Sequence, residues 1–262
     1  MDRLSRSIFA MAMLTGVAVR AEPLAFDETT VGGPGSGARA ELFMPTGATP
    51  VAAVIVLHGC NGVGPHDRVW AARLAEWGYA ALLVDSFRPR GFTEVCNRGR
   101  LVPPEAQARD AFDAALYLRA RPNIRAQRIG IIGFSHGGWA VLKAILAGVV
   151  RRADEPPFAA AVAFYPGCDP PGGAALETDT LILIGDNDEW TPVARCARWR
   201  DQVAPNGHTL QMKVYPGARL AFDALAMPHF FAGHYIGRDP AAAEDAPIET
   251  RAFLAARLGA PR

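Results

Sequence analysis

The segment IGIIGFSHGGWAVL, residues 129–142, decides how the rest of the chain is interpreted. Its isoleucine-rich start is typical of a strand buried on both faces, and its end is typical of a helix. Between the two, GFSHG at 133–137 matches the pattern Gly-x-Ser-x-Gly. In this context the pattern predicts a sharp turn that presents the hydroxyl of Ser135 as a nucleophile. An ordinary glycine-rich turn is the alternative.

On either side of this segment, strand-like and helix-like stretches alternate. Apolar runs predict strands at 51–57, 80–84, 129–132, 159–164, 181–184 and 210–214, and helical spacing predicts helices at 67–77, 103–120, 137–150, 192–203 and 240–258. This alternation predicts an α/β fold whose central sheet is mostly parallel, with helices on both faces and residues 38–43 as an antiparallel edge strand. Right-handed crossovers then bring the carboxyl ends of the strands to one edge, where such folds place their active sites.

The composition fits one globular domain. The chain has 262 residues, 50% of them hydrophobic, and its formal net charge is +1. This low charge argues against nucleic acid or an anionic membrane as partner.

The N-terminus has the pattern of a targeting segment. Arg3 and Arg6 precede an apolar stretch at 8–19, and small residues at 19 and 21 suit a cleavage site. We therefore expect a signal peptide over 1–21, a single domain over 22–262 and a periplasmic or secreted protein; a frayed N-terminal helix is the alternative. The apolar stretch is short for a membrane span, so we expect none in the mature protein.

The four cysteines favour disulfides over a metal site. No pair is spaced Cys-x-x-Cys, so neither zinc nor another metal or cofactor is expected. Bridges Cys60–Cys96 and Cys168–Cys196 would each join neighbouring loops in the predicted order of elements. Four free buried thiols are the alternative.

Two more loops at predicted strand ends carry groups that suit acyl transfer. The stretch HGCNG, 58–62, follows the first buried strand, and a glycine-rich loop there commonly supplies an oxyanion amide. We expect the backbone N–H groups of Cys60 and His136 to form that site. Asp188 follows the fifth strand, where a triad acid is expected in chain order. A plain tight turn and a solvated acidic turn are the respective alternatives.

Six stretches together carry a family resemblance. They are HGCNGVGP (58–65), DSFRPRG (85–91), RIGIIGFSHGGW (128–139), AFYPGC (163–168), LILIGDNDEWTP (181–192) and VYPGARLAFD (214–223). In these the sequence resembles the dienelactone hydrolase family of α/β-hydrolases. The resemblance implies hydrolysis of a small-molecule ester or lactone through an acyl-enzyme, with Ser135 as nucleophile and Asp188 as acid. The best-known members have cysteine at the position of Ser135, which leaves the substrate open.

The chain departs from the family at the triad base. Where the family reads like YPGAxHxFD, with the histidine as base, this chain has Leu220, which cannot accept a proton. His229, nine residues later, is the first substitute to consider and His234 the second, whereas His58 and His66 are expected on the oxyanion side of the serine. Two interpretations remain: a serine hydrolase of impaired activity, or an inactive hydrolase-like protein that binds an acyl or carboxylate ligand.

One further expectation concerns arginines. Arg88, Arg90 and Arg98 follow the second buried strand and could bind a substrate carboxylate. A solvated loop is the alternative interpretation.

Overall fold

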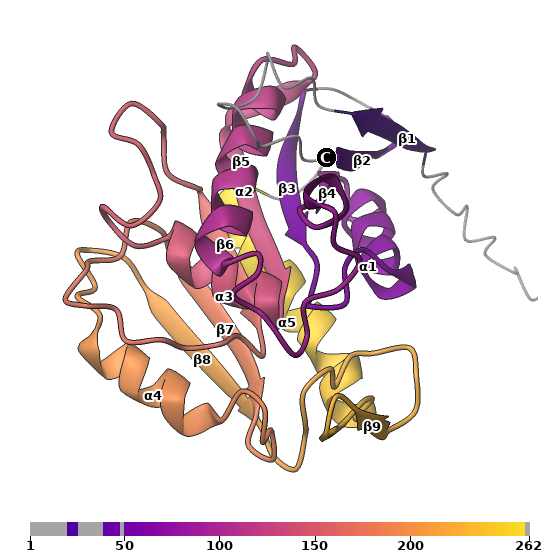
Figure 1. The fold of residues 1–262 in the computed structure, drawn as a ribbon. Coiled ribbons are helices and arrows are strands. Elements are labelled where there is room, and N and C mark those ends of the chain that lie inside the picture. The colour runs from indigo at the N-terminus through magenta and orange to yellow at the C-terminus, as the bar shows by residue number, and fades with distance from the viewer. Residues whose placement is uncertain (1–19, 26–38, 48–49, 260–262) are drawn as a thin grey trace, which may run out of the picture.

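The computed structural model describes residues 20–25, 39–47 and 50–259 (Figure 1). The residues that predict a signal peptide, Arg3, Arg6 and 8–19, lie outside these ranges. Arg20 and Ala21, the last residues of the predicted leader, begin a strand that pairs with Met44 and Phe43.

An eight-stranded sheet forms the centre of the fold, in the order β1-β2-β4-β3-β5-β6-β7-β8. Its strands are β1 (Arg20–Ala25), β2 (Arg39–Met44), β3 (Val51–Leu57), β4 (Ala80–Asp85), β5 (Ile124–Phe134), β6 (Ala160–Phe164), β7 (Thr180–Gly185) and β8 (Leu210–Tyr215). The six strands from β3 to β8 are parallel to their neighbours, and β2 and β1 add antiparallel at one edge. The prediction of a mostly parallel sheet is confirmed.

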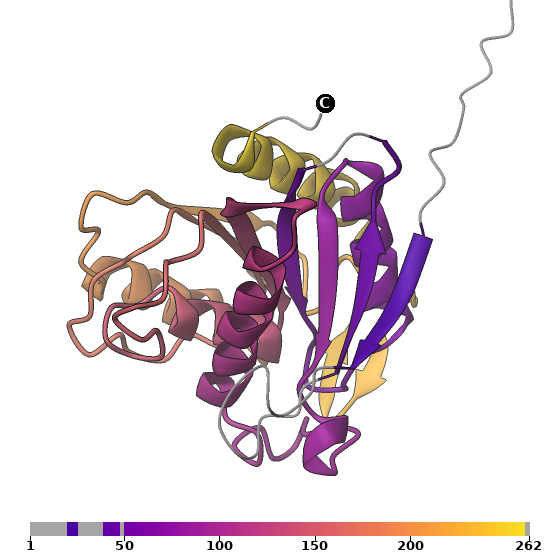
Figure 2. The same ribbon diagram turned by 90° about the horizontal axis from the view of Figure 1, so that it is seen from above.

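Helices cover both faces of the sheet (Figure 2). They are α1 (Pro65–Glu76), α2 (Pro104–Arg119), α3 (His136–Ala144), α4 (Val193–Gln202) and α5 (Pro240–Leu258). α1 and α5 pack on one face, and α2, α3 and α4 pack on the other. The central strands are buried on both faces because their apolar runs are continuous: in β3, Ile55 faces α2 and α3, whereas Val54 faces α1 and α5.

Three local features differ from the predictions. α3 ends at Ala144 rather than near residue 150, and a turn with Gly148 at φ 71° follows it. A short 3-10 helix, Arg88–Arg90, follows β4. A hairpin of β9 (His229–Phe231) and β10 (His234–Ile236) lies in the region of the loop after β8, beyond the strand ends (Figure 1). Its turn, Ala232-Gly233, has positive φ at both residues, as tight hairpins require.

In the described ranges, no helix combines the length and the apolar character that crossing a bilayer requires.

Candidate active site at Ser135

Ser135 lies at the turn between β5 and α3. Its backbone has φ 51° and ψ −108°, a combination that few non-glycine residues adopt. The neighbouring glycines have no room for a side chain: a Cβ on Gly133 would lie 2.2 Å from the carbonyl oxygen of Gly137, and a Cβ on Gly137 would lie 2.3 Å from that of Leu57. The backbone therefore makes the tight strand-to-helix turn of a nucleophile elbow.

The loop after β3 passes close to this serine. A Cβ on Gly59 would lie 3.8 Å from the Cβ of Ser135, and the next residue, Cys60, forms a disulfide with Cys96. Within the described ranges, the backbone amides of Cys60 and His136 donate no hydrogen bond to another residue. Both donors are therefore free to bind an oxygen that develops charge beside the serine.

Two buried histidine rings near the elbow are engaged in the fold. The Nδ1 atom of His136 lies 2.8 Å from the side-chain oxygen of Gln107, and its Nε2 lies 3.1 Å from the carbonyl oxygen of Gly99. Burial lowers the pKa of the His136 imidazole, which favours the neutral form. The Nε2 atom of His58 accepts a hydrogen bond from the amide of Ser86 at 3.2 Å. Neither ring is free to serve the serine as a base.

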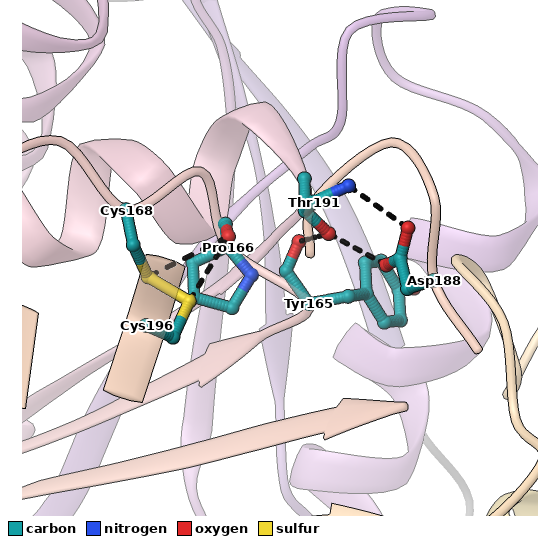
Figure 3. Close-up of a disulfide and its surroundings, with 6 residues drawn as sticks. All are labelled: Tyr165, Pro166, Cys168, Asp188, Thr191 and Cys196. Carbon is teal, nitrogen blue, oxygen red and sulfur yellow. Dashed lines mark hydrogen bonds between the residues drawn. A yellow bond between two sulfur atoms is a disulfide. The ribbon is translucent and has the colours of Figure 1, made fainter. Parts of the chain in front are cut away.

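Asp188 lies in the loop after β7 and is held by the residues that follow it (Figure 3). One carboxylate oxygen accepts hydrogen bonds from the amides of Trp190 and Thr191, both at 2.9 Å, and the other accepts from the hydroxyl of Thr191 at 2.6 Å. Burial raises the pKa of this carboxyl, although the three donors act in the opposite direction. The side chain is thus fixed by its own loop.

The second disulfide, Cys168–Cys196, lies beside this loop (Figure 3). Its sulfur atoms lie 3.7 and 3.6 Å from the carbonyl oxygen of Pro166, which separates the disulfide from Asp188. The bridge joins the loop after β6 to α4. Both disulfides have the pairing expected from the order of the elements.

Leu220 lies in the loop after β8, which is bound to the loop of the acid. The amide of Asn187, next to Asp188, donates to the carbonyl oxygen of Ala218 at 3.0 Å, and the carbonyl oxygen of Leu220 accepts from the amide of Gly237 at 3.0 Å. The leucine side chain is buried. The side chain at position 220, where the sequence analysis expected a base in other members of the family, is therefore a buried hydrocarbon group.

A cavity of about 350 Å³ opens at the serine. Ser135 and Leu220 both line it. Its wall is predominantly apolar and includes Phe134, Tyr165, Trp190, Ala221, Ala224, Leu225, Ala226, Phe231 and Ile236. The ionisable side chains among its lining residues, apart from the phenol of Tyr165, are His66, Asp67 and His229.

His229 and His234 follow the last strand of the sheet, as expected, but only the first lines the cavity. His229 is exposed, and its Nδ1 lies 2.9 Å from the carbonyl oxygen of Met227. His234 stacks on the indole of Trp190, with the ring centroids 4.4 Å apart, and is not among the lining residues.

His66 contacts a carboxylate that the sequence analysis did not connect with it. Its ring extends from the start of α1 to the loop that carries Leu220, where its Nε2 lies 2.9 Å from the Oδ2 of Asp223. The ring also packs edge-to-face on Phe134, with the centroids 4.8 Å apart. The cause is the start of α1 at Pro65, which brings the first turn of that helix over the segment after β8.

Asp223 is a buried carboxylate with three donors. Besides His66, the indole Nε1 of Trp70 and the hydroxyl of Tyr165 each donate to it at 2.7 Å. Burial lowers the pKa of His66, but the charge and hydrogen bond of Asp223, with a smaller contribution from Asp67, outweigh it and raise the pKa to about 10. Burial raises the pKa of Asp223, but its partners lower it below the usual value. An imidazolium–carboxylate pair is therefore the stable form at neutral pH.

A second cavity, of about 240 Å³, lies on another side of the serine. Both disulfides contribute to its wall through Cys60, Cys96 and Cys168, and Arg195 and Asp169 add charge. Ser135 thus lies between a predominantly apolar cavity and a more polar one.

The family is established by a match over most of the chain. The model of the Dienelactone hydrolase family matches residues 38–258. The chain belongs to the dienelactone hydrolase family. Its hydrolase character and its α/β-hydrolase fold follow from this membership.

Three proteins to which the chain is similar share between about a fifth and a quarter of their residues with it. A protein of Bradyrhizobium sp named "Probable 2-oxo-3-(5-oxofuran-2-ylidene)propanoate lactonase" is 26% identical over 219 residues, covering 77% of this chain and 85% of that protein. Among solved structures, the dienelactone hydrolase-like promiscuous phosphotriesterase P91, from metagenomic libraries, is 21% identical with a TM-score of 0.73, covering 92% of this chain and 99% of P91. The dienelactone hydrolase of Anabaena variabilis is 19% identical with a TM-score of 0.65, covering 91% of this chain and 98% of that one.

The arginines after β4 do not line the cavity in this member of the dienelactone hydrolase family. Arg90 forms a two-pronged ion pair with the buried Asp110, at 2.7 and 2.8 Å, and Arg88 lies 3.6 Å from Asp85. Neither these two nor Arg98 lines either cavity at the serine. The solvated-loop alternative therefore fits Arg88 and Arg98, which are exposed, whereas Arg90 has a structural role as the partner of Asp110.

The pair of His66 and Asp223 is the feature of the site that the sequence analysis missed. The two residues are 157 positions apart, and no motif joins them. The local signal is Asp223 itself: it ends the family stretch VYPGARLAFD, and after the apolar residues LAF a buried carboxylate needs a partner.

Proposed function

We propose that the protein hydrolyses small-molecule carboxylic esters or lactones through an acyl-enzyme on Ser135. The observation that carries the proposal is the strained elbow at φ 51°, which opens on a cavity and lies beside two free amides. The serine oxygen would attack the carbonyl carbon, and the amides of Cys60 and His136 would hold the resulting oxyanion. Asp188 is the acid of this arrangement by its position in the loop after β7.

The larger cavity supports a substrate with an uncharged apolar portion. A cavity of about 350 Å³ with mainly aromatic and aliphatic walls favours burial of such a group, at about 25 cal/mol per Å² of apolar surface. The more polar cavity on the other side of the serine suits the remainder of the substrate. No metal or cofactor takes part in the proposed reaction.

Leu220 limits the rate of this reaction. In serine hydrolases, loss of the base costs about 10⁶-fold in kcat and leaves about 10³–10⁴-fold over the reaction in water. His229 lines the cavity and is the substitute favoured by chain position. If no substitute acts, the same cavity would bind an acyl or carboxylate ligand without turnover, and the buried hydrocarbon of Leu220 is the observation that favours this second candidate.

Labelling with a fluorophosphonate probe tests the proposal. We expect slow labelling of the parent protein, none of Ser135→Ala, and labelling at least 10²-fold faster in Leu220→His, because position 220 lies beside the loop of Asp188. Equal labelling of the parent and Ser135→Ala would refute the serine as nucleophile. Binding of an ester without product in the parent, together with turnover in Leu220→His, would support the second candidate.

A periplasmic or extracellular location accords with the two disulfides, because such compartments preserve them. The test is the sequence of the mature N-terminus after expression with its own leader. Cleavage near residue 21 supports export, and an intact N-terminus in the cytoplasm opposes it.

A further inference from the structure

One imidazole at the cavity has the arrangement of a catalytic base. The Nε2 atom of His66 is bound to the carboxylate of Asp223 at 2.9 Å. Its Nδ1 has no hydrogen-bond partner in the described ranges, and the nearest carboxylate oxygen, from Asp67, lies 4.0 Å away. The side chain is 23% exposed, and His66 lines the same cavity as Ser135. One nitrogen is thus oriented by an acid, and the other, at ion-pair distance from Asp67, makes no hydrogen bond and is left to accept a proton, as the second and third members of a triad require.

The orienting carboxylate is rigidly held. Trp70 and Tyr165 both donate to Asp223, and neither residue belongs to the loop that carries it. Asp223 lies three residues after Leu220 on that loop, so its partner His66 reaches the side of the cavity where the family places its base. Because three donors hold the Asp223 carboxylate in place, its hydrogen bond also fixes the orientation of the His66 ring.

We propose that His66 is the general base for Ser135, oriented by Asp223, in place of the residue at position 220. This proposal rests on the proposed function of Ser135 as nucleophile. Asp223 is then a positioning residue, since it acts through the imidazole and not on the substrate, and it replaces Asp188 as the acid that orients the base.

The proton balance of the step is simple. As the bond from the Ser135 oxygen to the carbonyl carbon forms, the hydroxyl proton passes to Nδ1 of His66, and the carbonyl electron pair moves to the oxygen bound by the two amides. When the ester C–O bond breaks, the leaving alkoxide takes that proton. Water then attacks the acyl group, gives one proton to Nδ1, and the serine oxygen recovers it as it leaves.

The other histidines near the serine fit this role less well. His229 is exposed on a short hairpin, and a single backbone carbonyl is all that orients it. The ring of His234 is stacked on Trp190 and does not line the cavity. Both ring nitrogens of His136 lie within hydrogen-bond distance of buried acceptors. Only His66 combines a place at the cavity with a charged, buried partner.

The proposal predicts a characteristic pH dependence. The titratable groups that face His66 are Asp67 on its own helix, Asp223 after β8 and, through Asp223, the hydroxyl of Tyr165 after β6. The carboxylates hold the pKa of His66 at about 10. The free base is therefore scarce at pH 7, and the rate of Ser135 labelling should rise about tenfold per pH unit up to about pH 10.

The experiment measures the fluorophosphonate labelling rate of Ser135 from pH 6 to 10.5 in the intact protein, with Ser135→Ala as the blank at every pH. We expect His66→Gln, which can still donate to Asp223 but cannot accept the proton, to label at least 10²-fold more slowly at pH 9. His208→Gln is the matched control, since His208 also faces a carboxylate, Asp179 at 3.4 Å, but lies outside both cavities.

A second variant separates positioning from folding. In Asp223→Asn the negative charge is lost, so the midpoint of the pH profile should move to lower pH by at least one unit, a change that a merely structural role would not produce. NMR titration of the His66 imidazole in the parent should show the same midpoint as labelling does.

Several results would overturn the proposal and leave the nucleophile intact. These are a His66→Gln variant that labels like the parent, a larger loss in His229→Gln, or a pH profile without a midpoint near that of the His66 imidazole. Labelling confined to Leu220→His would also overturn it. Labelling that persists in Ser135→Ala would instead refute the proposed function.

Discussion

The His66–Asp223 pair should make the stability of the protein depend on pH in the alkaline range. Folding raises the pKa of His66 from 6.5 to about 10, and at about 1.4 kcal/mol per pH unit this corresponds to at most about 5 kcal/mol of stability. The side chain is 23% exposed and the pair is partly screened, so about half of that value is a realistic expectation. Because the pKa is raised in the folded state, the contribution is complete below pH 6.5 and is lost as the pH rises through about 10.

The measurement is urea unfolding of the parent and His66→Gln at pH 6.5, 8 and 9.5. Taking the difference between the two proteins at each pH removes contributions from other groups, which in the alkaline range are the five tyrosines and the two lysines, since all four cysteines are in disulfides. The advantage of the parent over His66→Gln should shrink by about 2 kcal/mol across this range. His229→Gln, whose histidine has no acidic partner in the described ranges, should follow the parent.

One result would refute this reasoning. If the free energies of unfolding of the parent and His66→Gln differed by the same amount at all three pH values, His66 would titrate alike in the folded and unfolded states. The imidazolium–carboxylate pair would then not be formed, and the alkaline midpoint expected for Ser135 labelling would lose its basis.

Three other predictions concern the framework of the site. Gly137→Ala should lower the free energy of unfolding by more than 3 kcal/mol, because the new Cβ would lie 2.3 Å from the carbonyl oxygen of Leu57. Gly64→Ala is the control, since its Cβ would lie 3.7 Å from the nearest atom, the Oδ2 of Asp67. Equal shifts in melting temperature for the two variants would contradict the expectation. Replacing Cys60 and Cys96 together by serine opens a bridge between residues 36 positions apart and should cost about 4 kcal/mol in urea unfolding, whereas no loss would mean that the loop is ordered without it. Asp110→Asn leaves the half-buried Arg90 without its anionic partner and should cost about 3 kcal/mol without changing Ser135 labelling, because neither residue lines a cavity at the serine; a change in labelling would contradict this.

The fold was predictable where one physical signal dominated. Continuous apolar runs flanked by helical patterns predicted the strands from β3 to β8. A strand has such a run when helices cover both faces of the sheet, because its side chains then point into a core on either face. The β9–β10 hairpin was missed because its turn is Ala232-Gly233 rather than a dipeptide that favours positive φ at both positions. The end of α3 was placed too late because apolar residues continue past Ala144 into a bridge made by Leu146.

The candidate site was predictable as far as its groups are local in sequence. The elbow at Ser135, the loop of Cys60 and the loop of Asp188 each follow a strand directly, so their place at one edge follows from the topology. No topological rule predicts the pairing of His66 with Asp223. The pairing depends on the angle at which α1 crosses the segment after β8 and on which turn of that helix contacts the segment. That information lies in the packing of the first turn of α1 against Phe134.

The backbone at position 220 is held independently of its side chain. The carbonyl oxygen of Leu220 accepts from Gly237, that of Phe222 accepts from Asp239 at 2.8 Å, and the carboxylate of Asp223 is bound by three donors. The loop therefore keeps its course whether residue 220 is a leucine or a histidine. The backbone of this loop thus does not depend on the residue at position 220, whereas the Leu220 side chain packs in the apolar cluster between the sheet and helices α1 and α5. Leu220→His places a polar ring in this buried position, so its thermal unfolding must be compared with that of the parent before the reactivities of the serine are compared.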